Sequence, residues 1–402
     1  MARYRHGLAA VLIFWGLAES AQAQWYHARL VTEEGDPIPF FLQLPENCAT
    51  ETATIVNGPE SIPTECERSE TGFALNFPVY DTRIDARFEP DGSARGEWVM
   101  VLPSFGEQAT RFEARPVSEP DPQNRFLMES EGSNQPPVDV SGSWRFDFDL
   151  YGVGKGVFEQ KSSQVVTGTI EVSSEYGDMR FLAGNVRGTH MYLSTFDGRH
   201  AFFLEGRVQP DGTMEGEWVH GIGFWDPFVA ERAEDFQLAD PLDRVRLIDN
   251  ASGLDLEPLR SAHYAGKAVI VEIFGTWCPN CNDLAPVLAD LHRKYRAEGL
   301  EILGLAFEYE HSAENERRVR EFEKKHGAEW DIVIAEESFE DLVKEGLGGL
   351  TPIEGVPVTI FMNRDGTVHG VYTGFSGPAT GNAYLEAKAR FETLTIEILR
   401  SK

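Results

Sequence analysis

The chain has 402 residues, enough for two or three domains of ordinary size. Hydrophobic residues make up 42% and charged residues 25%, which is close to a globular average and excludes wholesale disorder, collagen and a coiled coil. Lys and Arg number 36 against 65 Asp and Glu, giving a net charge of −29. Phosphate backbones would repel such a chain, so we expect no nucleic-acid partner. Four cysteines are too few to scaffold the whole fold.

The first residues have the pattern of a secretory signal peptide over 1–23. Two early arginines precede an apolar run over 7–18, and residues 21–23 (Ala-Gln-Ala) fit a small-x-small cleavage site. A signal anchor is the alternative, but the run is shorter than the roughly 20 residues that span a bilayer. We predict cleavage after Ala23 and a secreted or periplasmic protein with no stable membrane span. Disulfides are permitted in that compartment.

Residues 24–240 are predicted to be rich in β-structure and internally duplicated. Hydrophobic and polar residues alternate in short runs such as 144–150, and Asp-Gly pairs mark tight turns. The segment 87–99 (RFEPDGSARGEWV) recurs as 207–219 (RVQPDGTMEGEWV). A Pro-rich polar stretch separates the two copies. We therefore assign a first β-rich repeat to 24–118, a linker to 119–137 and a second repeat to 138–240.

This duplication allows two architectures. The copies could pair into one barrel or sandwich, or each could form a small β module. Trp98 and Trp218 occupy the same position in the repeat, and we predict that both lie in the core rather than in a binding site. No nucleophile, acid pair or phosphate loop stands out, so the sequence indicates a scaffold or a recognition module.

Cys48 and Cys66 occur only in the first copy. In an exported protein their spacing favours a structural disulfide, worth about 3 kcal/mol in the chain-entropy model. Two free thiols or a second redox pair are the alternatives. Zinc is disfavoured, because no further Cys and no paired His accompanies them. We expect no metal and no cofactor in the protein.

The character of the sequence changes from about residue 241. An apolar run over 268–274 predicts a buried strand, and it is followed by the motif Trp277-Cys278-Pro279-Asn280-Cys281. Apolar residues at helical spacing predict a helix over 283–298. The remaining expected elements are a strand over 300–307, a helix over 313–326, a strand over 331–335, a hairpin over 357–362 and 368–373, and a final helix over 377–399.

This order of elements around Trp-Cys-x-x-Cys resembles the thioredoxin fold, and more closely the exported thioredoxin-like reductases of the TlpA/ResA type. The resemblance covers about residues 241–402 and leaves out the β-rich half. It implies an α/β thioredoxin-like domain and an enzyme, a thiol–disulfide oxidoreductase that acts on protein substrates. A reducing role in an oxidising compartment would also require an electron-donating membrane partner.

The chemistry of the cysteine pair follows from its expected position. A helix N-terminus offers unpaired N–H groups and the positive end of the helix dipole, which stabilise a thiolate at Cys278. Cys278 is then the attacking nucleophile. Cys281, one turn further into the helix, resolves the mixed disulfide. A metal site is disfavoured, because no second Cys-x-x-Cys completes a zinc ligand set.

The resemblance assigns roles to further residues. Glu272 takes the place of a buried acid that accepts the proton of Cys281, although the family commonly has Asp there. A strand-end carboxylate that reaches solvent is the alternative. Pro357 takes the place of a cis-proline that brings the Val356 backbone opposite Cys278. Substrate-groove candidates beside Val356 are Trp277, Pro279, Asn280, Glu308 and Phe375, with Glu310 and His311 near the same sheet edge.

Two other functions compete with this interpretation. Peroxiredoxins share the fold and carry a helical insert like 313–326, but their pattern places Pro and Thr ahead of the cysteine at a different spacing. The β-rich half could instead be a binding or assembly module with a redox-sensitive thioredoxin-like appendage. The intact cysteine pair with Glu272 and Pro357 argues against a purely structural role.

Overall fold

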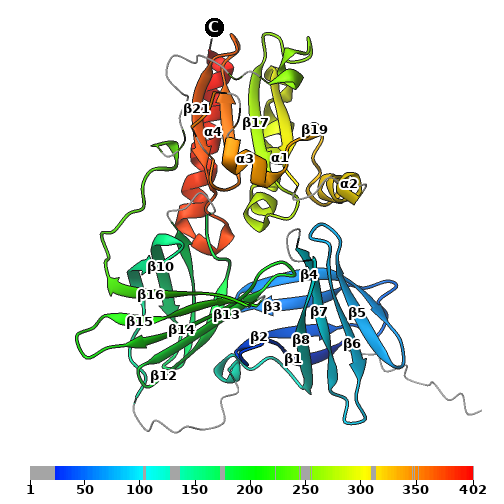
Figure 1. The fold of residues 1–402 in the computed structure, drawn as a ribbon, viewed down its shortest axis with the longest axis vertical. Coiled ribbons are helices and arrows are strands. Elements are labelled where there is room, and N and C mark those ends of the chain that lie inside the picture. Colours follow the sequence, from blue (N-terminus) through cyan, green and yellow to red (C-terminus); the bar gives the residue numbers. More distant parts are fainter. Residues whose placement is uncertain are drawn as a thin grey trace, which may run out of the picture.

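Two closed β-barrels precede an α/β domain in the computed structural model (Figure 1). In Figure 1 the barrels lie next to each other at the bottom, and the α/β domain stands above both. The predicted signal peptide lies, apart from Ala23, outside the described residues. The structure describes residues 23–102, 106–126, 136–172, 177–221, 223–243, 245, 254, 256–308, 314–345, 347, 349–351 and 353–401.

The first barrel closes within the first repeat. Each strand pairs antiparallel with its neighbours in the chain, and the first strand also pairs with the eighth. The short helix η1 (Pro122–Asn124) follows the barrel. The strands are β1 (Gln24–Val31), β2 (Pro37–Leu44), β3 (Ala53–Asn57), β4 (Glu60–Arg68), β5 (Gly72–Phe77), β6 (Thr82–Phe88), β7 (Ala94–Leu102) and β8 (Gly106–Val117).

The second barrel closes in the same way within the second repeat. Its first strand pairs with both the second and the last, so the two copies form two separate barrels. The strands are β9 (Gly142–Phe148), β10 (Gly152–Gln160), β11 (Val165–Val172), β12 (Leu182–Arg187), β13 (His190–Phe196), β14 (Ala201–Val208), β15 (Met214–His220) and β16 (Phe224–Arg232).

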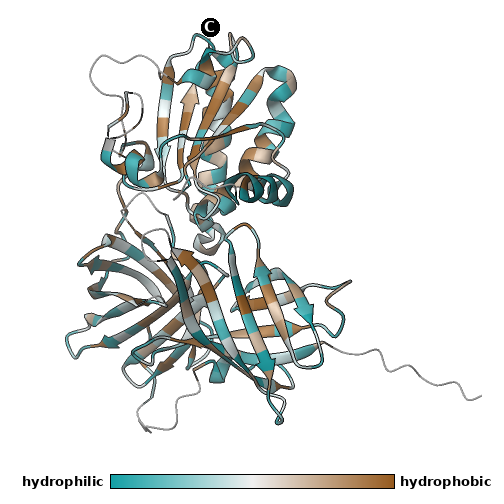
Figure 2. Cartoon of the chain, turned by 45° about the vertical axis from the view of Figure 1, so that its right-hand side comes forward, coloured by the Kyte–Doolittle hydropathy of each residue, from teal (hydrophilic) through white to brown (hydrophobic). Residues whose placement is uncertain are grey.

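The sequence repeat marks the same hairpin in both barrels. It runs from the sixth strand into the seventh, which is β6 to β7 in the first barrel and β14 to β15 in the second. Trp98 and Trp218 are 1% and 0% exposed, so the prediction that they belong to the core is confirmed. Figure 2 shows hydrophobic and hydrophilic residues alternating along many barrel strands, as expected where one face is buried.

The barrels pack against each other through an apolar contact. Phe196, at the end of β13, belongs to the core cluster of the first barrel. Its ring stacks on Phe40 with 4.7 Å between ring centroids and meets Trp98 edge-on at 5.4 Å. The side-chain amide of Asn57 donates a hydrogen bond of 2.8 Å to the carbonyl oxygen of Phe196. The first barrel also contains a disulfide between Cys48 and Cys66, with the Cα atoms 5.3 Å apart.

The α/β domain has a five-stranded sheet in the order β19-β18-β17-β20-β21. The first three strands in that order are parallel, and the last two run antiparallel as a hairpin. All seven residues of β17 are buried, as the apolar run predicts. The strands are β17 (Ala268–Phe274), β18 (Leu300–Ala306), β19 (Asp331–Ile334), β20 (Val358–Met362) and β21 (Val368–Thr373).

Helices cover both faces of this sheet. One core cluster joins α1 and α4 to the sheet, and another joins α2 and α3 to its other face. Among the residues that the structure describes, no helix is long and apolar enough to cross a membrane. The helices are η2 (Pro241–Asp243), η3 (Glu257–Arg260), α1 (Pro279–Tyr295), η4 (Arg296–Glu298), α2 (Glu314–His326), α3 (Phe339–Glu345), η5 (Pro378–Thr380) and α4 (Asn382–Arg400).

Two helix boundaries differ from the prediction. α1 begins at Pro279, four residues earlier than expected, because Cys278 is its N-cap and Pro279 fits the first helical position. α4 begins at Asn382 rather than at 377. The short helix η5 and Gly381, whose φ of 61° lies in the left-handed region, separate the preceding loop from α4.

Candidate redox site

The cysteine pair lies at the N-terminus of α1, with the two sulfur atoms bonded to each other. The Sγ atom of Cys278 accepts a hydrogen bond of 3.2 Å from the backbone N–H of Cys281. Cys278 is 5% exposed and Cys281 0%. In the reduced protein the same N–H and the helix dipole would stabilise a thiolate at Cys278. The buried Cys281 is placed to attack it from within.

Val356 and Pro357 form the opposite edge of the site. The peptide bond between them is cis. The Sγ atom of Cys278 lies 3.5 Å from the carbonyl oxygen of Val356. The backbone of Val356 is thus adjacent to the sulfur, where an extended substrate segment could pair with it.

Glu272 lies on β17, six residues before Cys278 in the chain, and is 0% exposed. Neither of its carboxyl oxygens has a hydrogen-bond partner among the described residues. Burial raises its pKa to about 8, so the carboxyl is mostly protonated at neutral pH. The alternative of a carboxylate that reaches solvent is therefore wrong. By strand alternation Glu272 shares the sheet face of Ile270, which packs with residues of α1.

The other residues of the motif are also covered. Pro279 and Asn280 are buried, and the side-chain amide of Asn280 donates a hydrogen bond of 3.2 Å to the carbonyl oxygen of Asp178 in the second barrel. The indole N–H of Trp277 donates to the carbonyl oxygen of Phe307 at 3.0 Å. These contacts hold the motif between the sheet edge and the barrel.

Two groove candidates have other positions. Glu308 is buried, and its carboxylate accepts hydrogen bonds of 3.0 Å from the backbone N–H and the hydroxyl of Thr276. It therefore fixes the loop ahead of Trp277, because a buried carboxylate requires such donors. Phe375 is buried against Phe391 of α4 and belongs to the core. Glu310 and His311 lie outside the described residues.

A cavity of about 260 Å³ adjoins Cys278, between the α/β domain and the second barrel. We did not predict this contribution of the barrel, which the sequence presents only as a scaffold or recognition module. The α/β domain contributes Trp277, Cys278, Pro279, Asn280 and Val356 to the lining. The barrel contributes Tyr151, Val172, Gly177, Asp178, Met179, Arg199, His200, Phe202 and His220.

The two histidines in this wall are uncharged near neutral pH. Burial lowers the pKa of His200 and lowers that of His220 further, well below its usual value. Nδ1 of His200 lies 3.4 Å from a carboxylate oxygen of Asp197, which partly opposes the effect of burial. The charged groups in the barrel wall are therefore Arg199, whose guanidinium contacts Met100 of the first barrel, and Asp178.

Part of the chain is similar to known proteins. The AhpC/TSA family matches residues 229–375. A protein named thiol-disulfide oxidoreductase ResA from Geobacillus thermodenitrificans is 28% identical over 146 residues, which cover 36% of this chain and 70% of that protein. The ResA protein of Bacillus subtilis is 26% identical over 125 residues, covering 31% of this chain and 60% of that protein. The chain thus spans less than two thirds of several of these relatives.

Solved structures are similar to part of the chain. A thiol:disulfide interchange protein from Chlorobium tepidum shows 25% identity and a TM-score of 0.27, covering 35% of this chain and 84% of that one. A thiol-disulfide isomerase from Corynebacterium glutamicum shows 21% identity and a TM-score of 0.29, covering 40% and 100%. The AhpC/TSA family model thus matches residues 229–375, and the C-terminal part of this chain is a thioredoxin-like domain that is similar to proteins named thiol-disulfide oxidoreductases.

Proposed function

We propose that this protein is an exported reductase of protein disulfides, with Cys278 as nucleophile and Cys281 as resolving cysteine. The observation that carries the proposal is the position of Cys278. Its sulfur caps α1, lies 3.2 Å from the N–H of Cys281 and 3.5 Å from the Val356 carbonyl oxygen. A nucleophile that is stabilised by the helix and adjoins a cavity meets the chemical requirements of disulfide exchange.

The reaction balances as a two-electron transfer. The Cys278 thiolate attacks one sulfur of a substrate disulfide, the substrate S–S bond breaks, and the other sulfur leaves as a thiolate that takes up a proton. Cys281 then loses its proton and attacks the Cys278 sulfur of the mixed disulfide. The bond between Cys278 and the substrate breaks, and the substrate sulfur leaves as a thiolate that takes up a proton. The substrate leaves as a dithiol, and the protein retains a Cys278–Cys281 disulfide, the state seen in the structure.

Other residues have supporting roles in this proposal. The ionised fraction of Glu272, a minority at neutral pH because its pKa is raised to about 8, accepts the proton of Cys281. Trp277, Pro279, Asn280 and Val356 line the substrate site. A membrane protein returns the electrons that restore the dithiol. Export would remove residues 1–23, so the mature protein would begin at Gln24, which mass spectrometry of its N-terminus checks.

Two cysteine variants test the mechanism. With dithiothreitol as electron donor, the wild type should reduce a small aromatic disulfide catalytically. Cys278→Ser should lose the first step, while Cys281→Ser should accumulate a mixed disulfide at Cys278, visible by mass spectrometry. Full turnover in both variants, or peroxide consumption that survives Cys281→Ser and exceeds disulfide reduction, would contradict the proposal.

A further inference from the structure

The second barrel covers the sulfur that must react. All four residues from Cys278 to Cys281 are buried, and the segment 177–180 of the second barrel lies against them. Gly177 approaches so closely that an added Cβ would lie 2.3 Å from the side-chain nitrogen of Asn280 and 2.4 Å from the carbonyl oxygen of Phe375. A folded protein substrate has no room between these surfaces.

Direct hydrogen bonds fasten this segment to the α/β domain. A carboxylate oxygen of Asp178 accepts a hydrogen bond of 2.6 Å from the backbone N–H of Gly377. The Asp178 carbonyl oxygen accepts from Asn280, and the hydroxyl of Ser376 donates to Glu171 at 2.5 Å. The loop after β21 and the start of α1 are thus both tied to the barrel.

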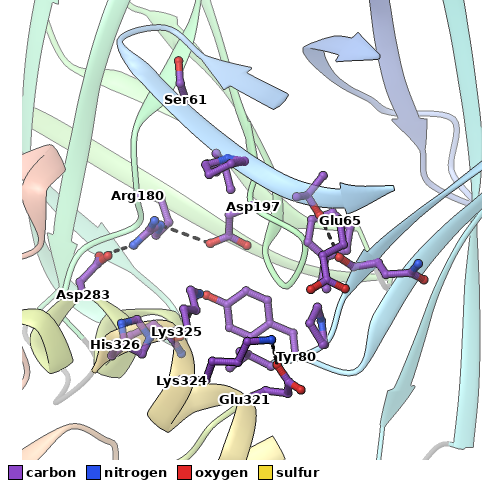
Figure 3. Close-up of a pocket in the computed structure, with 18 residues that line it drawn as sticks. Ser61, Glu65, Tyr80, Arg180, Asp197, Asp283, Glu321, Lys324, Lys325 and His326 are labelled. Carbon is purple, nitrogen blue, oxygen red and sulfur yellow. Dashed lines mark hydrogen bonds and ion pairs between the residues drawn. The ribbon is translucent and has the colours of Figure 1, made fainter. Parts of the chain in front are cut away.

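Arg180 is the centre of the attachment (Figure 3). It forms ion pairs with Glu60 of the first barrel at 2.9 Å, with Asp197 of the second barrel at 3.2 Å, and with Asp283 of α1. Figure 3 shows its guanidinium between Asp197 and Asp283 at the edge of a cavity of about 500 Å³. Asp283 lies two residues after Cys281, so this one side chain joins both barrels to the redox helix.

Removing Arg180 would weaken the attachment strongly. Three carboxylates with low exposure would be left together without their shared cation. Removing one partner of a buried ion pair leaves an unpaired buried charge and is strongly destabilising. An exposed ion pair contributes little to stability. The docked arrangement therefore depends on Arg180 more than on the surface ion pairs of the same barrel.

We propose that the second barrel is a size filter over Cys278. In the docked arrangement the cavity of about 260 Å³ admits small disulfides to the sulfur, and protein disulfides react only after the Arg180 and Asp178 contacts separate. This inference rests on the proposed disulfide exchange at Cys278. Small disulfides and protein disulfides follow the same two-electron exchange, and only their access to the sulfur differs.

The test compares substrates of two sizes in the full-length chain, with dithiothreitol as donor. The rate of reducing cystine and the rate of reducing insulin are measured for the wild type, Arg180→Met and Asp283→Asn/Ser376→Ala, because these three side chains hold the barrel but do not line the cavity at Cys278. Arg145→Met is the matched control, because Arg145 forms an exposed pair with Asp147 on the same barrel. Circular dichroism and limited proteolysis verify that each variant folds. If Arg180→Met does not fold, the double variant alone tests the size filter.

The filter predicts a selective gain. Insulin reduction should rise by about tenfold or more in the variants, as the undocked population grows, while cystine reduction changes by less than about twofold. Alkylation of reduced Cys278 by a polymer-linked maleimide should rise in parallel, and iodoacetamide labelling should not. Equal insulin rates in wild type and folded variants would overturn the filter. Loss of cystine reduction in every protein would overturn the proposed function instead.

Discussion

Glu272 contributes a pH dependence to the stability of the domain. Its pKa is about 8 when folded and near the ordinary 4.5 when unfolded. Below pH 4.5 both states hold the proton, so the carboxyl has no effect on stability. As the pH rises to 8 the unfolded state releases its proton first, so the free energy of unfolding falls across this window.

Glu272→Gln should therefore stabilise the protein while impairing it as an enzyme. The gain in the free energy of unfolding should reach up to about 3 kcal/mol at pH 7 and should vanish near pH 4. The second exchange step should slow, because Cys281 loses its proton acceptor. Urea unfolding at several pH values checks the first effect. Glu316→Gln, at an exposed position of α2, is the control, and an equal gain at pH 4 and 7 would contradict the assigned pKa.

At the scale of elements, Asn282 ties the start of α1 to its surroundings. Its side-chain amide donates hydrogen bonds to the carbonyl oxygens of Thr276 at 3.1 Å and Cys278 at 2.9 Å. Its side-chain oxygen bonds Nε2 of His326 at 2.8 Å and accepts from Lys325 at 3.1 Å. The loop carrying the motif and the end of α2 are both held through this one buried amide.

Asn282→Leu should loosen the motif without removing either cysteine. Leaving buried carbonyl groups unpaired should cost about 2 kcal/mol of stability, and the rate of exchange at Cys278 should fall. Asp290→Ala, at an exposed position of the same helix, should change neither quantity appreciably. Unfolding and disulfide reduction measured in parallel check this prediction. If the variant is measurably destabilised but its rate of disulfide exchange is unchanged, Asn282 does not position Cys278.

Local patterns in the sequence predict the strands and most helices of the α/β domain. The apolar run of β17 and the spacing in α1 are local signals, and the strands lie within a residue or so of their predicted bounds. The helix α4 begins later than predicted because Gly381 has a positive φ, and the spacing of hydrophobic residues does not reveal such a local conformation. Topology predicts that Glu308 and Phe375 lie near the motif, but it does not orient individual side chains, and neither residue lines the cavity at Cys278.

At the scale of the whole molecule, the duplication was visible in sequence but the placement of the copies was not. The Asp178–Gly377 bond joins residues 199 apart in the chain, and no periodic pattern marks such a contact. Asp283, a charged residue two positions after the motif, is in sequence typical of a solvated helix start, so nothing in the sequence marks its ion pair with Arg180.

The Cys48–Cys66 disulfide should stabilise the first barrel without affecting the redox site. Cys48→Ser/Cys66→Ser should lower the free energy of unfolding of that barrel by about 3 kcal/mol, because the unfolded loop gains freedom. The reactivity of Cys278 should stay the same. Denaturant unfolding followed by barrel tryptophan fluorescence checks the loss. A changed rate of cystine reduction in the folded variant would show that this disulfide takes part in the redox chemistry.

The reduction potential of the Cys278–Cys281 couple tests the central claim most directly. The full chain is equilibrated in dithiothreitol buffers and trapped with iodoacetamide, and the fraction of alkylated Cys278 is determined by mass spectrometry. A reductase predicts a potential near about −270 mV, the thioredoxin value. A value near about −120 mV would identify an oxidant that donates disulfides, and failure of the two cysteines to form a disulfide at any potential would contradict the mechanism itself.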